Sequence, residues 1–279
     1  MPIARADFDY VCDLVRGRSG IVLETGKEYL VEARLAALIR QQNIESIGAL
    51  VSRLRGNRLD PLHRLTVEAM TTNETSFFRD QSPFEALKKQ ILPTLLAARA
   101  ATKSLTIWCA ASSTGQEPYS IAMTLCENIP RVEEWKLIFI ATDISLDMIA
   151  RSRSGSYNQI EVNRGLPAAM LVKYFEKRGL VWQVKDRLRT MIEFREMNLV
   201  QPWLNLPPMD IIFMRNVLIY FDTPTKSGIL AQARQLLRPD GYLFLGSAET
   251  SMGLDDGLER TPIEKSSCYR IRQRVANAA

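Results

Sequence analysis

The strongest constraint on the fold is a strand, a loop of small residues and a helix start, all within residues 105–120. The sequence LTIWCAASSTGQEPYS begins as an apolar run, passes through Ala, Ser, Thr and Gly, and opens a helix at Gln116–Glu117–Pro118. Small side chains let the backbone approach a ligand, and the free N–H groups of a helix start donate hydrogen bonds to it. The pattern predicts a site for a nucleotide-bearing cofactor.

Short apolar runs alternate with helical segments from residue 105 onward. The runs are LTIWCA, LIFIAT, MIEFREM, MDIIFMR and GYLFLGS, and the helices are expected near 117–128, 145–152 and 224–237. This alternation predicts a doubly wound α/β fold whose mostly parallel sheet binds its ligand at the carboxyl ends of the strands. We expect Arg238–Gly241 to form a turn that ends the last helix.

The first 75 residues show helical periodicity and no strand pattern. Asp60 and Pro61 predict a helix start, and Ser82, Pro83 and Glu85 predict a capping box for a helix that runs to about residue 98. We therefore expect an all-α domain over 1–75, a connecting segment over 76–98, and an α/β domain over 99–279. Residues 157–192 interrupt the α/β rhythm, and we expect there a helix over 166–179 and a short antiparallel hairpin as an insertion.

Composition excludes several classes of protein. No apolar run approaches the roughly 20 residues of a membrane span, and MPIARADFDY carries charges where a signal peptide keeps an apolar stretch. Four scattered Cys and one His provide no metal-ligand spacing, so we expect no metal site and free thiols in the cytoplasm.

The net charge of +5 is unevenly distributed, because residues 151–200 contain ten Lys or Arg against five Asp or Glu. This excess indicates either an ordinary solvated surface or a face that meets an acidic partner, and charge alone does not decide between them.

A second motif, TTNETSFFRD, covers residues 71–80. Together with residues 105–120 it resembles the chemotaxis receptor methyltransferase family, CheR, whose members read close to TTN-x-T-x-FFR and W-x-AA-x-STGEEPYS. The resemblance extends over residues 7–272. It implies a class I methyltransferase sheet with a small all-α N-terminal domain and an inserted antiparallel β-subdomain. It also implies S-adenosylmethionine as donor, S-adenosylhomocysteine as product, and chemoreceptor glutamates as acceptors.

Asp143 follows the second expected strand, where doubly wound folds place an acid that accepts hydrogen bonds from ribose hydroxyls. The alternative is that Asp143 caps the helix expected near Ser145. Both roles are compatible, and we favour ribose binding.

The resemblance implies a set of cofactor-binding residues: Asn73, Thr75, Arg79, Glu117, Asp143, Asn198, Leu199, Arg215 and Asn216. Asn73, Thr75 and Arg79 would contact the methionine end, Asn198 and Leu199 would border the adenine, and Arg215 and Asn216 would lie beside the sulfonium. The alternatives are an exposed charge for Arg79 and strand-end capping for the two asparagines. Gln116 replaces a family acid and Pro83 stands where many members have His, and we expect both to affect packing rather than chemistry.

A glutamate acceptor has a pKa of about 4.3, so it is ionised at neutral pH and requires no general base. We therefore expect His63 to be a surface or capping residue. Catalysis would depend on alignment, with Arg79 orienting the acceptor or donor and Tyr220 offering a hydroxyl near the methyl group. For Tyr220 the alternative is a core aromatic residue.

In the family, basic residues of the N-terminal helical domain are thought to recognise the helical cytoplasmic region of transmembrane chemoreceptors. The candidates in this chain are Arg34, Arg40, Arg53, Arg55 and Arg58, and the alternative is an ordinary solvated face. Members that dock on a receptor's C-terminal pentapeptide have an extra glycine-containing stretch in the insertion. EKRGLVWQV has only Gly179, so we expect no tight binding of that pentapeptide.

Two rival functions remain at this stage. A nucleic-acid methyltransferase would explain the basic segment, but the base-methylating motif N/D-P-P-Y/F is absent where RNVLIYF stands. A signalling adaptor that binds the cofactor without turnover would keep the same donor residues. We favour the receptor methyltransferase and expect neither nucleic-acid binding nor membrane insertion.

Overall fold

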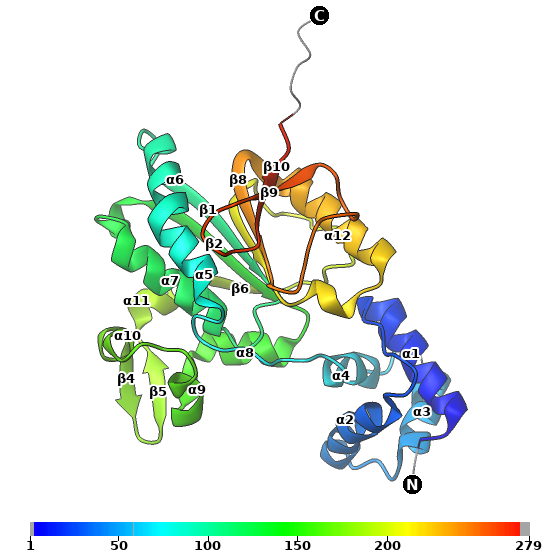
Figure 1. Ribbon diagram of the computed structural model, residues 1–279. Coiled ribbons are helices and arrows are strands. Elements are labelled where there is room, and N and C mark those ends of the chain that lie inside the picture. The colour runs from blue at the N-terminus through cyan, green and yellow to red at the C-terminus, as the bar shows by residue number, and fades with distance from the viewer. Residues whose placement is uncertain (1–2, 58, 274–279) are drawn as a thin grey trace, which may run out of the picture. The chain divides into compact units, whose positions relative to one another are not determined.

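The computed structural model describes residues 3–57 and 59–273. The chain forms two compact units, whose helices and strands are labelled in Figure 1. The first unit contains residues up to Thr72 together with Tyr220–Thr225, and the second contains Asn73–Ile219 and the residues from Lys226 onward.

The first unit is built from four helices, as its periodicity predicts: α1 (Arg5–Ser19), α2 (Glu28–Gln41), α3 (Ile47–Gly56) and α4 (Leu62–Ala69). Their apolar faces enclose one core that includes Phe8, Val15, Leu35 and Leu50. Ile21 also forms an isolated antiparallel bridge with Phe221, which joins the returning segment to this unit.

The start of α4 differs from the prediction by one residue. The helix begins at Leu62, although the Asp60 carboxylate still accepts a hydrogen bond from the Leu62 N–H at 2.9 Å. The prediction of a surface position for His63 is wrong, because the ring is 4% exposed and its Nδ1 lies 3.0 Å from the Asp60 carbonyl oxygen. His63 therefore belongs to the core and to the start of this helix.

The second unit is organised around a seven-stranded sheet of order β6-β2-β1-β7-β8-β10-β9. The five strands β6, β2, β1, β7 and β8 are parallel to one another. Strand β10 is antiparallel to both β8 and β9. The strands are β1 (Ser104–Ala110), β2 (Lys136–Asp143), β6 (Glu193–Glu196), β7 (Met209–Met214), β8 (Leu237–Leu245), β9 (Leu258–Thr261) and β10 (Cys268–Ile271). The predicted doubly wound α/β class is confirmed.

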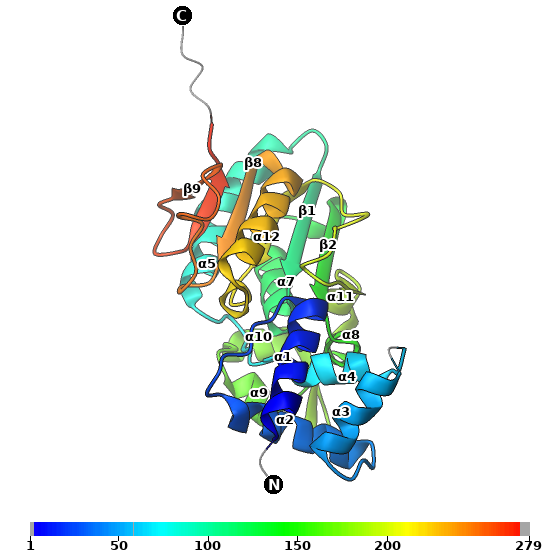
Figure 2. The same ribbon diagram turned by 90° about the vertical axis from the view of Figure 1, so that its right-hand side faces the viewer.

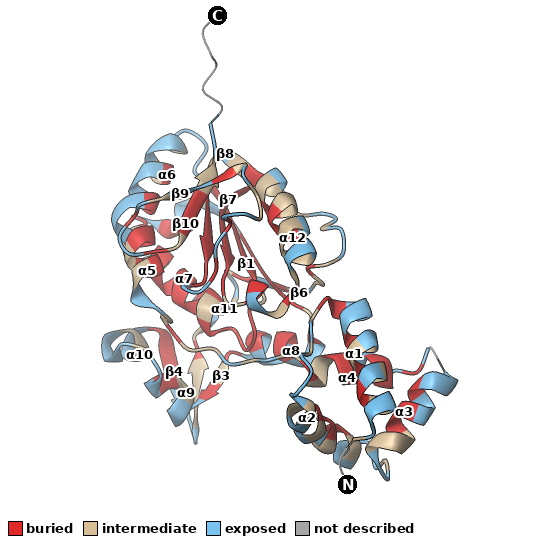
Figure 3. Cartoon of the chain, turned by 45° about the vertical axis from the view of Figure 1, so that its right-hand side comes forward, coloured by how far each residue is buried: buried red, intermediate tan, exposed pale blue. Residues whose placement is uncertain are grey.

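Helices cover both faces of this sheet, with α5 to α7 on one face and α12 on the other (Figures 1 and 2). The helices are α5 (Gln81–Ala86), the π-helix η1 (Leu87–Ile91), α6 (Leu92–Ala98), α7 (Gln116–Asn128), the 3-10 helix η2 (Val132–Glu134), α8 (Leu146–Ser154), the 3-10 helix η3 (Leu218–Tyr220) and α12 (Thr223–Leu236). Figure 3 shows that the buried residues gather in the strands and on the inward faces of the helices. Within the described residues, no helix has both the length and the apolar character that crossing a bilayer requires.

The predicted insertion contains a separate three-stranded antiparallel sheet of order β3-β5-β4. Its elements are β3 (Ser156–Asn158), α9 (Gln159–Asn163), α10 (Ala168–Tyr174), β4 (Phe175–Arg178), β5 (Val181–Val184) and α11 (Asp186–Arg189). The expected helix over 166–179 is shorter, because the chain enters β4 at Phe175. The hairpin is confirmed, and β3 is too short to give a periodic signal of its own.

Two further predictions of local structure are wrong. Helix α5 begins at Gln81 and has no side-chain cap, so Ser82 lies inside the helix and forms no capping box. Residues Arg238–Gly241 belong to β8, where Met209 pairs with Leu237 and Ile211 with Tyr242 across a register shift. The register shift accommodates Arg238–Gly241 within the strand, although the sequence predicts a turn there.

Candidate functional site at the carboxyl edge of the large sheet

The loop between β1 and α7 has an unusual backbone. Ala111 and Ser113 adopt left-handed conformations with φ of 51° and 49°, and Gly115 follows with φ of 93°. A left-handed backbone at a residue other than glycine costs of order 1–3 kcal/mol and persists only where the surrounding structure enforces it. Such enforced conformations cluster at ligand sites, so the loop itself marks a candidate site.

Two buried hydroxyl groups hold this loop in place. Ser152 in α8 donates a hydrogen bond to the Ser113 carbonyl at 2.8 Å, and Tyr157 in β3 donates one to the Thr114 carbonyl at 2.7 Å. Burial raises the pKa of Tyr157 well above its ordinary value, so the phenol remains a donor. A Cβ on Gly115 would lie 3.0 Å from both hydroxyl oxygens, which explains why glycine is needed there.

Asp143, at the end of β2, connects the loop to the next helix. One carboxylate oxygen accepts from the Ser113 N–H at 2.8 Å, and the other accepts from the Ser145 N–H at 3.0 Å. Ser145 is the N-cap of α8, and its own hydroxyl accepts from Met148. Asp143 thus orders both loops at the carboxyl end of β2.

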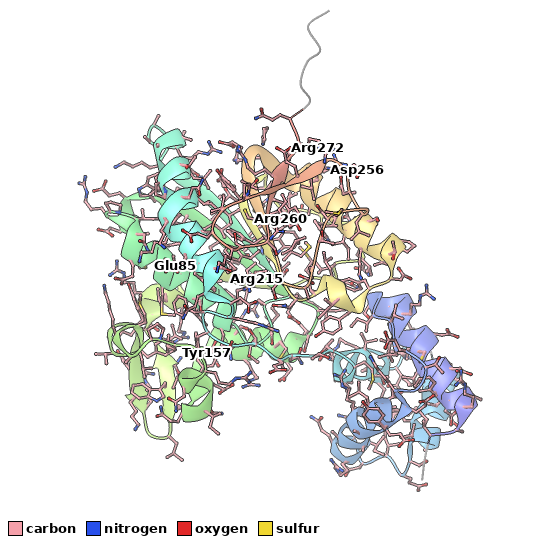
Figure 4. All side chains as sticks on the ribbon, viewed as in Figure 1. Glu85, Tyr157, Arg215, Asp256, Arg260 and Arg272 are labelled. Atoms are coloured by element: carbon pink, nitrogen blue, oxygen red, sulfur yellow. The ribbon has the colours of Figure 1, made fainter. Side chains whose placement is uncertain are left out.

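Arg215, which is labelled in Figure 4, directly follows β7. It is the centre of an ion-pair network. Its side chain is 1% exposed and pairs with Glu117 in α7 and, at 2.8 Å, with Asp80. The same guanidinium donates to the Arg79 carbonyl at 3.0 Å. Phe78 and Asp80 have φ of 48° and 53°, so Arg215 holds the FFRD segment in a strained conformation beside the helix start.

The thiol of Cys109 in β1 completes this network, because its Sγ donates to Glu117 at 3.4 Å. Burial, followed by the charge of Glu117, raises the pKa of the thiol well above its ordinary value. Cys109 is therefore a neutral donor to Glu117 rather than a reactive thiolate.

The remaining predicted cofactor residues lie on neighbouring segments of the second unit. Arg79 is half-buried, precedes α5 and donates to the Glu74 carbonyl at 3.1 Å, so it is not an exposed charge on a helix. The Asn73 carbonyl accepts from the Ser113 hydroxyl at 2.8 Å, and Thr75 is half-buried. After β6, the Asn198 side chain accepts a hydrogen bond from the Val200 N–H at 3.2 Å. This contact is strand-end capping, the alternative to adenine binding for this residue.

Leu199 and Asn216 complete this set. Leu199 is 7% exposed, and its carbonyl accepts from the Trp203 indole at 3.2 Å. Asn216 has φ of 57° and donates its backbone N–H to Glu249 at 2.8 Å. Six of the nine predicted residues thus lie at or after the ends of β1, β2, β6 and β7, which are adjacent parallel strands of one sheet, whereas Asn73, Thr75 and Arg79 lie in the segment before α5.

Two orphaned donors at this edge match the chemistry of S-adenosylmethionine. The Ser112 hydroxyl and the Arg215 Nε are buried, and neither has a hydrogen-bond partner among the described residues. A buried polar atom without a partner is costly and requires an explanation, and at this edge a bound ligand would supply the missing partners. Donors near the loop suit the polar groups of the cofactor, and the Asp143 carboxylate suits its ribose hydroxyls, so the residues present fit this cofactor.

Tyr220 belongs to the segment that packs with the first unit. Its carbonyl accepts a hydrogen bond from the Val22 N–H at 2.9 Å, and its side chain is half-buried. Tyr220 is therefore not a fully buried core aromatic, which was the alternative to a catalytic role.

Most of the candidate receptor-binding arginines are held by their own chain. Arg34 donates to the Met70 carbonyl and to the Thr72 hydroxyl, Arg53 pairs with Asp60 at 2.7 Å, and Arg55 donates to the Ala6 carbonyl at 2.9 Å. Arg40 is exposed, and no acid among the described residues pairs with it. Arg58 lies outside the described residues.

The basic segment 151–200 is largely neutralised. Seven of its Lys and Arg residues form ion pairs, namely Arg151, Arg164, Lys173, Arg178, Arg187, Arg189 and Arg195. Some of the partners, such as Glu74 and Glu127, lie outside the segment, which is why counting charges within it gives an excess. This pattern favours the solvated-surface interpretation.

Sequence reasoning missed three residues of this site. Ser152 and Tyr157 carry no local motif, because their partners are backbone carbonyls about 40 positions earlier. The sequence does contain a signal for Glu249. It is an acid in GSAET, next to the apolar run GYLFLG, so it is expected near the end of a strand.

Together the fold and this edge define an S-adenosylmethionine-dependent methyltransferase. The family model described as "CheR methyltransferase, SAM binding domain" matches residues 73–266, and the one described as "CheR methyltransferase, all-alpha domain" matches residues 6–71. The chain belongs to the CheR methyltransferase family.

Its curated relatives match over nearly their whole length. The chain is 40% identical to chemotaxis protein methyltransferase 1 of Pseudomonas aeruginosa, covering 98% of this chain and 100% of the relative. It is 38% identical to chemotaxis protein methyltransferase Cher2 of Pseudomonas putida over the same shares. It is 37% identical to chemotaxis protein methyltransferase 1 of Vibrio cholerae, covering 97% and 98%.

Proposed function

We propose that this protein transfers a methyl group from S-adenosylmethionine to glutamate carboxylates of chemoreceptors, giving glutamyl methyl esters for chemotactic adaptation. The observation that supports this most is the near full-length similarity to chemotaxis methyltransferases, combined with a family-type loop after β1 held in a left-handed backbone. We place the reaction in the cytoplasm, where receptor helices would be accessible.

The residues that would hold the cofactor all belong to the second unit. In this proposal Asp143 accepts from the ribose, Asn198 and Leu199 border the adenine, and Glu117 with Arg215 fixes the loop-to-helix turn. The methionine end would contact Asn73, Thr75 and Arg79, and the Arg215–Asn216 turn would lie beside the sulfonium. When bound, the cofactor supplies an electrophilic methyl group on a positively charged sulfur.

The chain's own contribution to the reaction is alignment and removal of water. The acceptor glutamate is ionised at neutral pH, so no residue needs to take a proton from it. Arg79 has one guanidinium nitrogen on the Glu74 carbonyl, which leaves other N–H groups to orient an acceptor carboxylate. Tyr220 offers a phenolic hydroxyl that would donate to the reacting groups.

The test of this function is labelled methyl transfer to receptor-containing membranes, using the purified chain and methyl-labelled S-adenosylmethionine. We expect base-labile label on the receptor protein, as a methyl ester requires. Label on DNA or RNA would favour the nucleic-acid methyltransferase, and cofactor binding with no transfer to any substrate would favour the adaptor.

The two catalytic assignments have a test of their own. Tyr220→Phe should lower turnover about tenfold with little change in S-adenosylhomocysteine affinity, because a single donor to the reacting groups is lost. Arg79→Lys should raise the receptor KM, since an ammonium cannot bind a carboxylate through a planar fork. Unchanged turnover in Tyr220→Phe would remove that residue from the mechanism.

For the receptor we propose the all-α domain over 1–75 as the recognition domain, connected through 76–98 to the catalytic domain over 99–279. Arg40 is the leading contact residue because it has no ion-pair partner among the described residues, while Arg34, Arg53 and Arg55 are secondary. Arg40→Ala should weaken receptor methylation without affecting S-adenosylhomocysteine binding. Ala36 and Ala37 on the same helix make this contact less basic than in some family members.

We also propose that the small inserted sheet does not bind a receptor C-terminal pentapeptide tightly. The β4–β5 connection consists of Gly179 and Leu180 alone, without the extra glycine-containing stretch of tether-binding members. Micromolar affinity for such a pentapeptide in a calorimeter would contradict this.

A further inference from the structure

Glu249, in the segment after β8, is a buried acid to which the proposed function gives no role. It is 7% exposed, and its carboxylate accepts hydrogen bonds from three backbone N–H groups at 2.6 to 2.8 Å. The donors are Gly246, Asn216 and Leu218, and the Ile219 N–H lies 3.3 Å away. One side chain thus binds both its own loop and the turn that follows β7.

These two loops leave no space between them. A Cβ on Gly246 would lie 2.7 Å from a Glu249 oxygen, 2.8 Å from the Asn216 side-chain nitrogen and 2.9 Å from its backbone nitrogen. Asn216 itself is held at a φ of 57°. The turn after β7 therefore has its backbone direction set by Glu249, and β7 is the direct neighbour of β1, whose loop forms the candidate cofactor site.

The charge of Glu249 is not balanced by a cation. No Lys or Arg among the described residues forms an ion pair with it, and its donors are main-chain N–H groups. By contrast, the equally buried Asp210 at the opposite edge of the sheet is paired with Arg99. The main-chain N–H groups stabilise the carboxylate but carry no net charge, so a negative charge without a neighbouring cation remains at the ligand edge and suits a ligand that carries positive charge.

We propose that Glu249 is a positioning residue that fixes the Arg215–Asn216 turn and favours a cationic donor over its uncharged-sulfur product. This inference rests on the proposed function, in which that turn lies beside the sulfonium. The negative field of Glu249 stabilises the charged sulfur of S-adenosylmethionine, whereas the thioether of S-adenosylhomocysteine gains nothing from it. Glu249 therefore affects the affinities for both ligands, through the turn, and also the ratio of the affinity for S-adenosylmethionine to that for S-adenosylhomocysteine, through its charge.

The experiment is calorimetric binding of both ligands to the full chain and to three variants. Glu249→Gln removes the charge and places N–H groups where acceptors are needed, so both affinities should fall, that for S-adenosylmethionine about tenfold further. Glu249→Asp keeps the charge on a shorter arm, so both affinities should fall in parallel while their ratio stays at the wild-type value. Glu259→Gln, an exposed acid on β9, is the matched control and should change nothing.

Equal losses for the two ligands in a folded Glu249→Gln variant would overturn the charge-selecting role. Wild-type affinities in Glu249→Asp would overturn the positioning role, and this variant still tests that role if Glu249→Gln does not fold. A wild-type chain that binds neither ligand would instead overturn the proposed function, which separates the two failures.

Discussion

Arg215 and Arg99 each form an ion-pair cluster with two carboxylates, at opposite ends of the strands of one sheet. The Arg99 cluster contains a second arginine, because the Nε of Arg238 lies 3.4 Å from Asp210. Each arginine pairs with one buried and one half-exposed carboxylate: Arg215 with Glu117 and Asp80, and Arg99 with Asp210 and Asp240. In the second cluster, Arg99 binds Asp210 through two nitrogens, and the other Asp210 oxygen accepts from the Thr106 N–H at 2.8 Å. The hydrogen bonds that Arg99 donates to Asp240 and then to Asp210 raise the pKa of Arg99.

The two clusters differ in what surrounds them. The Arg215 cluster leaves a buried Nε without a partner and adjoins residues with left-handed backbones, among them Phe78, Asp80 and Asn216. None of Arg99, Asp210 and Asp240 has a positive φ, and the Nε of Arg99 is paired. Next to them, Lys103 has a φ of 43° and donates its N–H to the Arg99 carbonyl, and the buried Nε of Arg238 has no hydrogen-bond partner among the described residues. The difference is therefore that the Arg215 cluster contains a strained charged residue, Asp80. Such strain is tolerated where a ligand uses it, so similar sets of charges can serve stability at one edge and binding at the other.

The largest expected effect comes from Arg99→Ala. The Asp210 side chain, 2% exposed, would lose its main cationic partner, so the free energy of unfolding should fall by about 3–5 kcal/mol. Affinity for S-adenosylhomocysteine, measured by calorimetry where the variant is folded, should remain at the wild-type value. If affinity also fell, the Arg99 cluster would contribute to cofactor binding, and the two edges would not have separate roles.

Glu117→Gln tests the other edge without changing volume. Arg215 would keep Asp80 but lose the charge of its more buried partner, and the loop-to-helix turn would loosen. We expect S-adenosylhomocysteine affinity to fall about 30-fold, equivalent to about 2 kcal/mol for a hydrogen bond between charged groups. Asp210→Asn is the matched control, because it removes the corresponding charge at the amino edge and should lower the melting temperature while affinity is retained.

The contrast also explains how much the sequence could predict. The strands, the loop at 110–115 and Asp143 follow from local periodicity and from the order of elements, because each signal lies within a few residues. The partners of Arg215 lie 98 and 135 positions away, so no local pattern reveals the network. The resemblance to a family supplied Arg215 as a residue, but only packing shows that it holds Glu117 and Asp80.

The same reasoning explains the errors. His63 is predicted to be a surface or capping residue because the reaction needs no general base, yet the fold buries its ring against the start of α4. The Arg238–Gly241 stretch has turn composition, but the Asp240 side chain pairs with Arg99 and pairing with β7 resumes at Tyr242. In the second case a contact from another part of the chain overrides a local preference.

Tyr157→Phe removes a single hydrogen bond to the cofactor loop while leaving the aromatic packing of the ring on Phe77. The Thr114 carbonyl would lose its donor in a buried environment, which costs about 1 kcal/mol and should weaken S-adenosylhomocysteine about fivefold. Tyr174→Phe is the matched control, since its hydroxyl donates to Glu127 rather than to the loop. Equal affinities in both variants would mean that the inserted sheet does not contribute to the carboxyl-edge site.

The smallest effect concerns acid stability at the amino edge. The hydrogen bond from Arg99 holds the pKa of Asp240 below its ordinary value of 3.8, with the Arg99 charge adding to it. A carboxyl whose pKa is lower in the folded state stabilises the fold above its unfolded pKa, and this contribution disappears as the pH falls through the folded value. Because the Asp240 side chain is 43% exposed, screening limits the contribution to less than about 1 kcal/mol. Melting temperatures from pH 5 down to about pH 3 should therefore fall slightly less steeply for Asp240→Asn than for the wild type, since the variant has no proton to gain at this position. Identical slopes would mean that Arg99 stabilises the amino edge through Asp210 alone, and the resemblance between the two clusters would then be limited to their buried partners.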